Sequence, residues 1–238
     1  MRLDKLLSQS GALTRSEARR LIRAGQATVD GAPERDPGRD VAGREVRLAG
    51  KAVEDEPYQY MLLHKPAGVL TAARDSHART VMDLVPEALA RRDVLPVGRL
   101  DKDTTGALLL TNDGELAHRL LAPKRHVRKE YHATVDGPLG PDDVRAFAEG
   151  VNLGDFVSAP AEMRVLDSTP EESRAVLWLT EGKFHQVKRM FEARGRTVTA
   201  LHRAAFGPLT LDGLSEGEYR PLTVQERGLL RAAAELEE

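Results

Sequence analysis

The stretch VGRLDKDTTGALLLTND, residues 97–113, joins a polar segment to an apolar run. Its apolar run, ALLLT at 107–111, is typical of a strand that enters a protein core. Polar and turn-forming residues precede that run, among them Asp101, which has Arg99 and Lys102 close by in the sequence. A carboxylate between two cations, directly before a core strand, raises the question of whether this loop only turns the chain or also carries chemistry.

Other strand-like runs lie before and after this stretch. Each is a short segment rich in β-branched, aromatic or leucine side chains. They are YMLL (60–63), KEYHATV (129–135), AVLWLT (175–180) and TVTAL (197–201). Helical patterns separate some of these runs, but strands and helices do not alternate strictly. The pattern therefore predicts an α+β domain and argues against a doubly wound parallel sheet.

Capping residues indicate where helices begin in this part of the chain. Asn112, followed three residues later by Glu115, predicts a helix start just after the apolar run. Pro141 fits the first turn of another helix, where its missing N–H is harmless. Thr223 and Glu226 form the capping pattern of the final helix.

A basic helix is predicted near the N-terminus. Thr14 and Glu17 form a capping box in TRSEARRLIRAG. Arg15, Arg19 and Arg23 recur every fourth residue and therefore lie along one flank of that helix. We expect these three arginines to contact the phosphates of a nucleic acid.

The first 50 residues have the pattern of a small, separate unit. After the helical segments, the pair Asp30-Gly31 predicts a hairpin turn between two short strands. The segment AGKAVEDEP then resembles a linker. We expect an N-terminal module over 1–50, a linker over 49–57 and a second domain over 58–238.

Composition restricts the class of protein. The chain has 238 residues, of which 41% are hydrophobic and 30% charged, as in soluble globular proteins. It contains no window of about 20 apolar residues and no apolar core of a secretory signal near its start. The absence of cysteine excludes disulfides, thiolate nucleophiles and cysteine-bound zinc. We expect a cytoplasmic protein.

The distribution of charge is more informative than the net charge of −2. Residues 1–25 hold six Arg or Lys against two acids, and residues 118–129 hold five against none. Residues 181–206 hold six against two. One such run is usually a solvated face, but three in a nearly neutral chain favour a polyanionic partner.

Common cofactor and metal motifs are missing. The seven histidines show no metal-ligand spacing, and there is no glycine-rich phosphate loop or nucleophile elbow. We therefore expect neither a metal nor a cofactor. Asp101 remains as the residue with a plausible chemical role.

The residues alone leave two interpretations of Asp101 open. It is either a turn residue at the entry to a strand, or a nucleophilic or general-base carboxylate kept ionised by a cation. Candidate cations are Arg99 and Lys102 nearby, and Lys188 and Arg189 on a later basic helix. Spacing does not choose among them.

Tyr131, in RKEYHATV, also has two interpretations. An aromatic residue that alternates with Ala133 and Val135 on a strand is commonly part of the core. An aromatic ring beside a basic run can instead stack on a nucleobase, an interaction of about 1–3 kcal/mol. These patterns predict a two-part, polyanion-binding protein with one candidate catalytic aspartate.

The same residues carry a family resemblance. GRLDKDTTGALLLTNDG resembles the signature of pseudouridine synthases that act on single ribosomal RNA sites, in particular the small-subunit branch. Four more segments match that family's motifs, and the first 50 residues resemble the S4 RNA-binding module. The four segments are LLHKPAGVL (62–70), RKEYHATVDG (128–137), EGKFHQVKRMFEARG (181–195) and GEYRPLT (217–223).

The resemblance implies a role for individual residues. Asp101 would be the nucleophile that attacks the target ribose–base system, and Tyr131 would stack on the uracil and assist proton removal from C5. Lys188 would pair with Asp101, and Arg99 would displace or hold the flipped nucleotide. The resemblance also implies a mixed, mostly antiparallel sheet flanked by helices. Lys65 and Arg189, in two of the matching motifs, are expected to contact RNA.

Three hypotheses follow from the resemblance. The leading one is a monomeric enzyme that isomerises uridine to pseudouridine in 16S rRNA, free or in an assembly particle, without cofactor or metal. The same chemistry on 23S rRNA is the nearest alternative, and an inactive RNA-binding assembly factor is the other. A sugar hydrolase would need a second positioned carboxylate. Asp103 is expected to shape the turn instead.

Overall fold

The computed structural model contains two compact units. The first comprises residues 1–59 with 85–94, and the second comprises 60–84 with 95–238. The structure describes the whole chain except residues 10–12, 54–57, 91 and 237–238.

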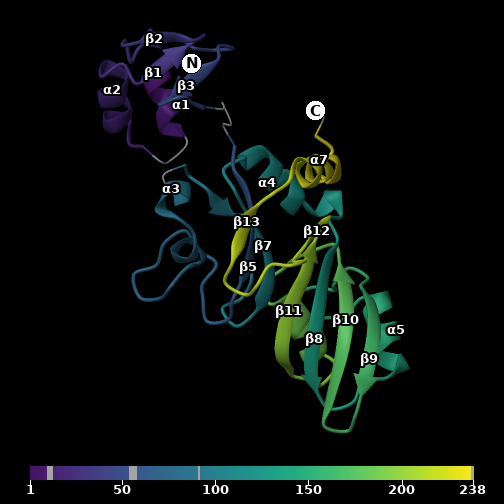
Figure 1. The fold of residues 1–238 in the computed structure, drawn as a ribbon. Coiled ribbons are helices and arrows are strands. Elements are labelled where there is room, and N and C mark those ends of the chain that lie inside the picture. The colour runs from purple at the N-terminus through teal and green to yellow at the C-terminus, as the bar shows by residue number, and fades with distance from the viewer. Residues whose placement is uncertain (10–12, 54–57, 91, 237–238) are drawn as a thin grey trace. The chain divides into compact units, whose positions relative to one another are not determined.

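In the first unit, two helices pack on a small antiparallel sheet (Figure 1). The helices α1 (Leu3–Gln9) and α2 (Arg15–Arg23) contribute leucine, isoleucine and alanine side chains to its core. The strands pair in the order β2-β1-β3-β4. They are β1 (Ala27–Val29), β2 (Ala32–Glu34), β3 (Val46–Leu48) and β4 (Lys51–Ala52), and the unit also includes the short helix α3 (Glu87–Ala90).

The capping box and the turn that the sequence predicted are present in this unit. Thr14 Oγ1 accepts a hydrogen bond from Glu17 N at 3.2 Å, and Glu17 Oε2 accepts one from Thr14 N at 2.7 Å, which completes the capping box. Asp30 and Gly31, both with positive φ, turn the chain between β1 and β2. The expected linker, 49–57, overlaps β4, and its last four residues lie outside the described residues.

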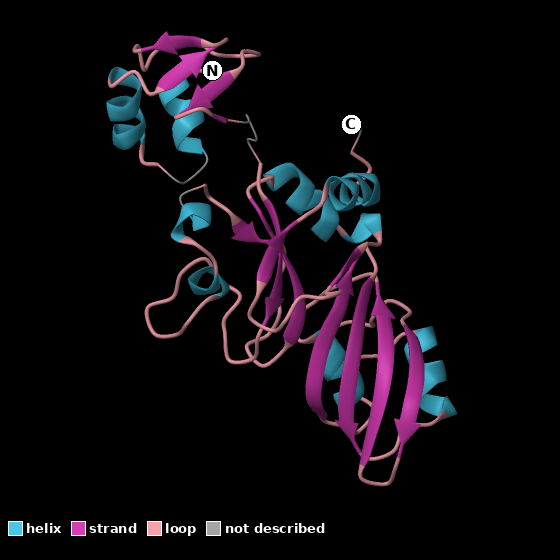
Figure 2. Cartoon of the chain, in the orientation of Figure 1, coloured by secondary structure: helices cyan, strands magenta, loops and turns pink. Residues whose placement is uncertain are grey.

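The second unit is built on a long mixed sheet (Figure 2). Its main path runs β13-β5-β7-β11-β8-β10-β9, and only the β7–β11 pair is parallel. β6 (Leu95–Pro96) pairs with β7, and β12 (Leu209–Thr210) pairs with β11. The seven strands of the path are β5 (Tyr60–Lys65), β7 (Thr105–Thr111), β8 (Lys129–Asp136), β9 (Glu162–Ser168), β10 (Glu172–Leu179), β11 (Val198–Phe206) and β13 (Tyr219–Pro221). The α+β class is confirmed.

Strand β7, from the stretch that opened the sequence, lies inside the core. Leu108, Leu109 and Leu110 are all fully buried, which explains why this strand is apolar without alternation. Strand β8, which β11 separates from β7 in the sheet, alternates buried and less buried positions instead, and one of its buried side chains is Tyr131. The loop before β7 therefore projects Asp101 from the end of a rigid strand.

Helices cover parts of this sheet. α4 (Gly114–Leu121) and α7 (Val224–Ala233) lie side by side, and α5 (Pro141–Glu149) packs on β9 (Figure 1). The remaining helical segments are α6 (Gln186–Glu192), η1 (Val81–Leu84) and η2 (Pro123–Arg125). Among the described residues, no helix has the length and apolarity needed to cross a membrane.

The start of α4 differs from the sequence expectation. Asp113, one residue after Asn112, is the N-cap, and its Oδ1 accepts a hydrogen bond from Leu116 N at 3.0 Å. Its other oxygen accepts from the hydroxyl of Tyr60 at 2.8 Å. Tertiary contact with Tyr60 thus favours the aspartate over the neighbouring asparagine. The capping box of Thr223 and α7 is present as expected.

Candidate active site

A buried lysine fixes the loop that carries Asp101. The side chain of Lys65, at the end of β5, is 0% exposed. Its Nζ donates hydrogen bonds to the carbonyl oxygens of Thr104 (2.8 Å), Pro66 (3.0 Å) and Lys102 (3.3 Å). Burial lowers the pKa of Lys65 to about 8. The expected contact of Lys65 with RNA is not supported, because all three donors are used inside the protein.

Further hydrogen bonds hold the backbone on either side of Asp101. The hydroxyl of Thr71 donates to Leu100 O at 2.7 Å, and Leu100 N donates to the same hydroxyl at 3.2 Å. Thr104 N donates to Asp101 O at 3.1 Å. These contacts fix the main chain, while the Asp101 side chain stays 28% exposed.

Two basic side chains lie close to the Asp101 carboxylate, one on α6 and one directly before it. His185 Nε2 lies 3.4 Å from Oδ1, and Lys188 Nζ lies 3.5 Å from Oδ2. Lys188 makes its shorter hydrogen bonds to Asp103, at 2.6 and 2.8 Å, and they lower the pKa of the Asp103 carboxyl. Asp103 therefore binds Lys188 in addition to its expected place in the turn.

The turn before α6 positions His185. The side chain of Gln186 is buried and accepts a hydrogen bond from Lys183 N at 2.9 Å, while its amide donates to Glu181. His185 has φ of 50°, an uncommon backbone conformation for a non-glycine residue. The ring of Phe184 stacks on its imidazole, with centroids 3.8 Å apart. Sequence reasoning missed His185, although its spacing of three residues from Lys188 on a helical segment was a usable signal.

A cavity of about 390 Å³ collects most of the expected catalytic residues. Arg99, Asp101, Tyr131 and Lys188 all line it, together with His185. Tyr131 is 9% exposed and comes from the centre of β8, so its ring has little freedom. The volume falls in the usual range for small-molecule sites, and it can hold a single nucleobase.

Arg189 is placed differently from its expected role. It follows Lys188 on α6, but its Nη2 donates to Leu153 O at 2.9 Å and to Asp155, and its guanidinium lies over the ring of Phe156. The side chain is engaged within the protein, and this arrangement gives no support to its expected contact with RNA.

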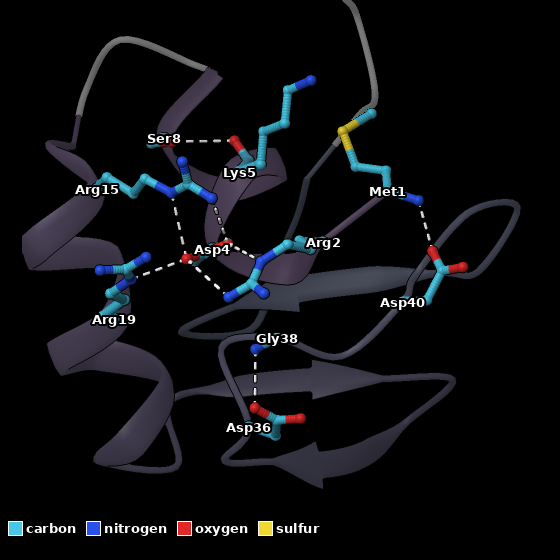
Figure 3. A network of polar contacts seen from close by, with 10 residues as sticks. All are labelled: Met1, Arg2, Asp4, Lys5, Ser8, Arg15, Arg19, Asp36, Gly38 and Asp40. Atoms are coloured by element: carbon cyan, nitrogen blue, oxygen red, sulfur yellow. Dashed lines mark hydrogen bonds and ion pairs between the residues drawn. The ribbon is translucent and has the colours of Figure 1, made fainter.

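The N-terminal unit contains a second group of charges around an aspartate (Figure 3). Arg2, Arg15 and Arg19 all donate to the carboxylate of Asp4, with distances between 2.8 and 3.4 Å. Asp4 is fully buried, whereas the side chain of each arginine is about half exposed. The cluster therefore presents three guanidiniums against one carboxylate, a net positive surface.

Electrostatics in this cluster favour the ionised carboxylate. Burial alone would raise the pKa of Asp4, but the hydrogen bonds from Arg2, Arg15 and Arg19 outweigh it and hold the pKa well below its usual range. Two of the arginines expected on one helix flank are thus tied to α1, and Arg2 joins them. Arg23 makes no ion pair with the residues that the structure describes.

Together, a partly exposed carboxylate in a nucleobase-sized cavity and a basic N-terminal unit match the arrangement expected of an enzyme that acts on nucleic acid. Residues 59–193 match the model of the RNA pseudouridylate synthase family, and residues 1–46 match the S4 domain. The chain belongs to the RNA pseudouridylate synthase family, as the sequence motifs predicted.

Individual relatives cover nearly the whole chain. Ribosomal small subunit pseudouridine synthase A of Escherichia coli (strain K12) is 40% identical, over 95% of this chain and 98% of the relative. Ribosomal large subunit pseudouridine synthase B of Bacillus subtilis (strain 168) is 38% identical, over 98% and 97%. A crystal structure described as a pseudouridylate synthase is 35% identical, with a TM-score of 0.67 over 97% of this chain and 99% of the other.

Proposed function

We propose that this chain converts uridine to pseudouridine in ribosomal RNA, with 16S rRNA as the first candidate substrate. The observation that carries the proposal is the Asp101 carboxylate in one cavity with Tyr131, within 3.5 Å of both His185 and Lys188. The ionised form of a carboxylate is the form that can act as a nucleophile, and the Lys188 ammonium lies beside it.

In the proposed reaction, the target uridine leaves its stack and enters the cavity. Asp101 attacks the ribose–base system, the bond between N1 and C1′ breaks, and its electron pair stays with the uracil. The uracil rotates, and C5 forms a bond to C1′ as Asp101 is released unchanged. The C5 proton is lost to water, and N1 takes up a proton from water. Substrate and product are isomers, so the reaction needs no co-reactant.

Other residues of the cavity have supporting roles in this proposal. Tyr131 stacks on the uracil and assists proton removal from C5. Lys188 and His185 stabilise the charge of Asp101, with Asp103 holding Lys188 in reach of it. Arg99 lines the same cavity and holds the flipped nucleotide.

Two kinds of ribosomal RNA are candidate substrates. The relative named for the small subunit is 40% identical to this chain, and the relative named for the large subunit is 38% identical. These two values are too similar to choose between the substrates. The resemblance of the sequence motifs to the small-subunit branch favours 16S rRNA, and the same chemistry on 23S rRNA is the second candidate. The S4 domain and the Asp4 cluster supply affinity for the RNA backbone. The monomeric state and the cytoplasmic location stay predictions.

The first test is release of tritium from C5-labelled uridine. It uses 16S and 23S transcripts and ribosomal subunits, with Asp101→Asn as the control. Release from 16S material by the wild type, absent in Asp101→Asn, is the expected result. Release only from 23S material would keep the chemistry and change the substrate. Tight RNA binding with no release from any substrate would favour an inactive assembly factor.

A further inference from the structure

Two buried polar atoms beside the cavity have no hydrogen-bond partner. They are Thr104 Oγ1 and Arg203 Nη2, from side chains that are 1% and 2% exposed. Both residues line the cavity that holds Asp101. Across the residues that the structure describes, only Arg125 Nε is in the same situation, and Arg125 does not line this cavity. Because buried polar groups are nearly always paired, these two atoms are candidates to bind a ligand that enters the cavity.

The backbone and one edge of Arg203 are held by β7. Its Nε donates to Ala107 O at 2.8 Å across the parallel strand pair. The strands approach so closely that a Cβ on Gly106 would lie 2.2 Å from Arg203 O. The guanidinium also lies over the ring of Phe206. Arg203 therefore has little freedom to turn away from the cavity.

The surroundings of Arg203 are positively charged. Lys129, also buried, donates to Val127 O at 2.9 Å and Thr180 O at 3.4 Å. Burial and the charge of Arg203 lower the pKa of Lys129 to about 8, against a smaller opposing effect of Glu181. No carboxylate of the described residues makes an ion pair with Arg203 or Lys129. A ligand at this place is expected to present hydrogen-bond acceptors.

Thr104 lies in the loop of Asp101 and lines the same cavity. Its N–H donates to Asp101 O, and its carbonyl accepts from Lys65, so only its hydroxyl is left unpaired. Tyr131 is the cross-strand neighbour of Arg203 on β8. A base that stacks on Tyr131 would thus have Arg203 and Thr104 among the side chains around it.

Resting on the proposed function, we propose that Arg203 and Thr104 recognise the Watson–Crick edge of the flipped uracil. Uracil presents a carbonyl, an N–H and a second carbonyl along this edge, whereas cytosine replaces one carbonyl by an amino group. Arg203 donates to O4 of uracil, and the Thr104 hydroxyl accepts from N3–H. The Arg203 contact selects uracil over cytosine, because cytosine carries at C4 an amino group that cannot accept from a guanidinium. The Thr104 contact orients the base, since a hydroxyl can accept from N3–H of uracil or donate to N3 of cytosine.

Arg203 also acts during the reaction in this proposal. When the bond between N1 and C1′ breaks, the electron pair that stays on the uracil spreads onto its carbonyl oxygens. A buried cation that already donates to one of them stabilises this charge. Loss of Arg203 should therefore lower kcat as well as base selection.

The test compares binding of uridine 5′-monophosphate and cytidine 5′-monophosphate to the full chain by ligand-observed NMR. Wild type is expected to prefer the uridine nucleotide by about tenfold. Arg203→Lys should bring that preference close to one, whereas Thr104→Val, which keeps the shape of the side chain, should weaken binding of both nucleotides. Matched controls outside the cavity are Thr199→Val on β11 and Arg196→Lys, and both should keep the preference. Thermal unfolding checks that each variant is folded.

A second arm measures tritium release with the same variants. We expect kcat/KM to fall about tenfold for Thr104→Val and about 100-fold for Arg203→Lys, with overall RNA affinity unchanged. Equal binding of the two nucleotides by wild type, an unchanged preference in folded Arg203→Lys, or unchanged binding of both nucleotides by folded Thr104→Val would overturn the inference. A selective wild type that releases no tritium from any RNA would keep the uracil site and reject the proposed function.

Discussion

Asp4 and Asp101 are both aspartates among cations, yet they are arranged in opposite ways. Asp4 is fully buried, and three arginines donate to it at 2.8 to 3.4 Å. Asp101 is 28% exposed, and its two partners stay at 3.4 and 3.5 Å. The carboxylate of Asp4 is saturated with donors, whereas that of Asp101 faces a cavity and is only loosely held.

Burial and the number of hydrogen-bond donors distinguish a structural aspartate from a nucleophilic one. A carboxylate that accepts several charge-assisted hydrogen bonds stabilises its surroundings and is a poor nucleophile, because those donors would have to be given up first. A carboxylate with longer ion pairs keeps its charge and remains free to approach a substrate. We therefore expect the two aspartates to respond differently to the same substitution.

The largest effect is expected from Asp101→Asn. Loss of the nucleophile should lower kcat by about 10⁴-fold or more, with RNA affinity nearly unchanged. Asp4→Asn should change kcat by less than about twofold and weaken RNA binding instead. Single-turnover tritium release and filter binding measure the two quantities. Similar losses of kcat in both variants would break the distinction between the two aspartates.

A smaller loss is expected from Lys65→Met. Three carbonyl groups around the Asp101 loop would lose their shared donor, and a displacement near 1 Å can lower the rate by about 100-fold. RNA affinity should stay unchanged, because the side chain is buried. Lys124→Met, which removes an exposed lysine, is the control for kcat. A loss of RNA affinity with normal kcat would restore the original expectation that Lys65 contacts RNA.

Acid should destabilise the Asp4 cluster selectively. The pKa of Asp4 is depressed, so its stabilising contribution is present above the ordinary value of 3.8 and is lost as pH falls through the lower folded-state value. Hydrogen exchange of α1 and α2 amides should therefore accelerate below about pH 4. Asp4→Asn should destabilise this unit by about 1–3 kcal/mol at neutral pH and flatten the acid response. An unaltered acid response in the variant would assign it to other groups.

The smallest effects concern single arginines of the N-terminal unit. Arg15→Gln and Arg19→Gln should each reduce the salt dependence of RNA binding by roughly one unit of slope, if each neutralises one phosphate. Arg23 lies on the same helix outside the cluster, so Arg23→Gln is the matched comparison. A smaller change for Arg23 would show that the Asp4 cluster forms the phosphate contact. Equal changes would assign the contact to the helix flank.

Local signals allowed much of the fold to be predicted. The capping boxes at Thr14 and Thr223 formed as expected, because a cap joins residues only three positions apart. The strand patterns around residues 107–111 and 129–135 also correspond to strands. The cap at Asp113 was missed, since its choice depends on distant Tyr60. Strand β9 was missed as well, because its exposed edge carries a weak apolar pattern.

By itself, the sequence determined the fold class, the family and the identity of Asp101, Tyr131 and Lys188 as candidates. Only the tertiary structure decided which groups surround them. Asp101 meets His185 because strands β7 and β11, far apart in the chain, lie parallel next to each other and α6 leads into β11. The same crossing buries Arg203 beside Thr104. Residue spacing predicts interactions between residues a few positions apart, whereas contacts across a sheet depend on how the whole core packs.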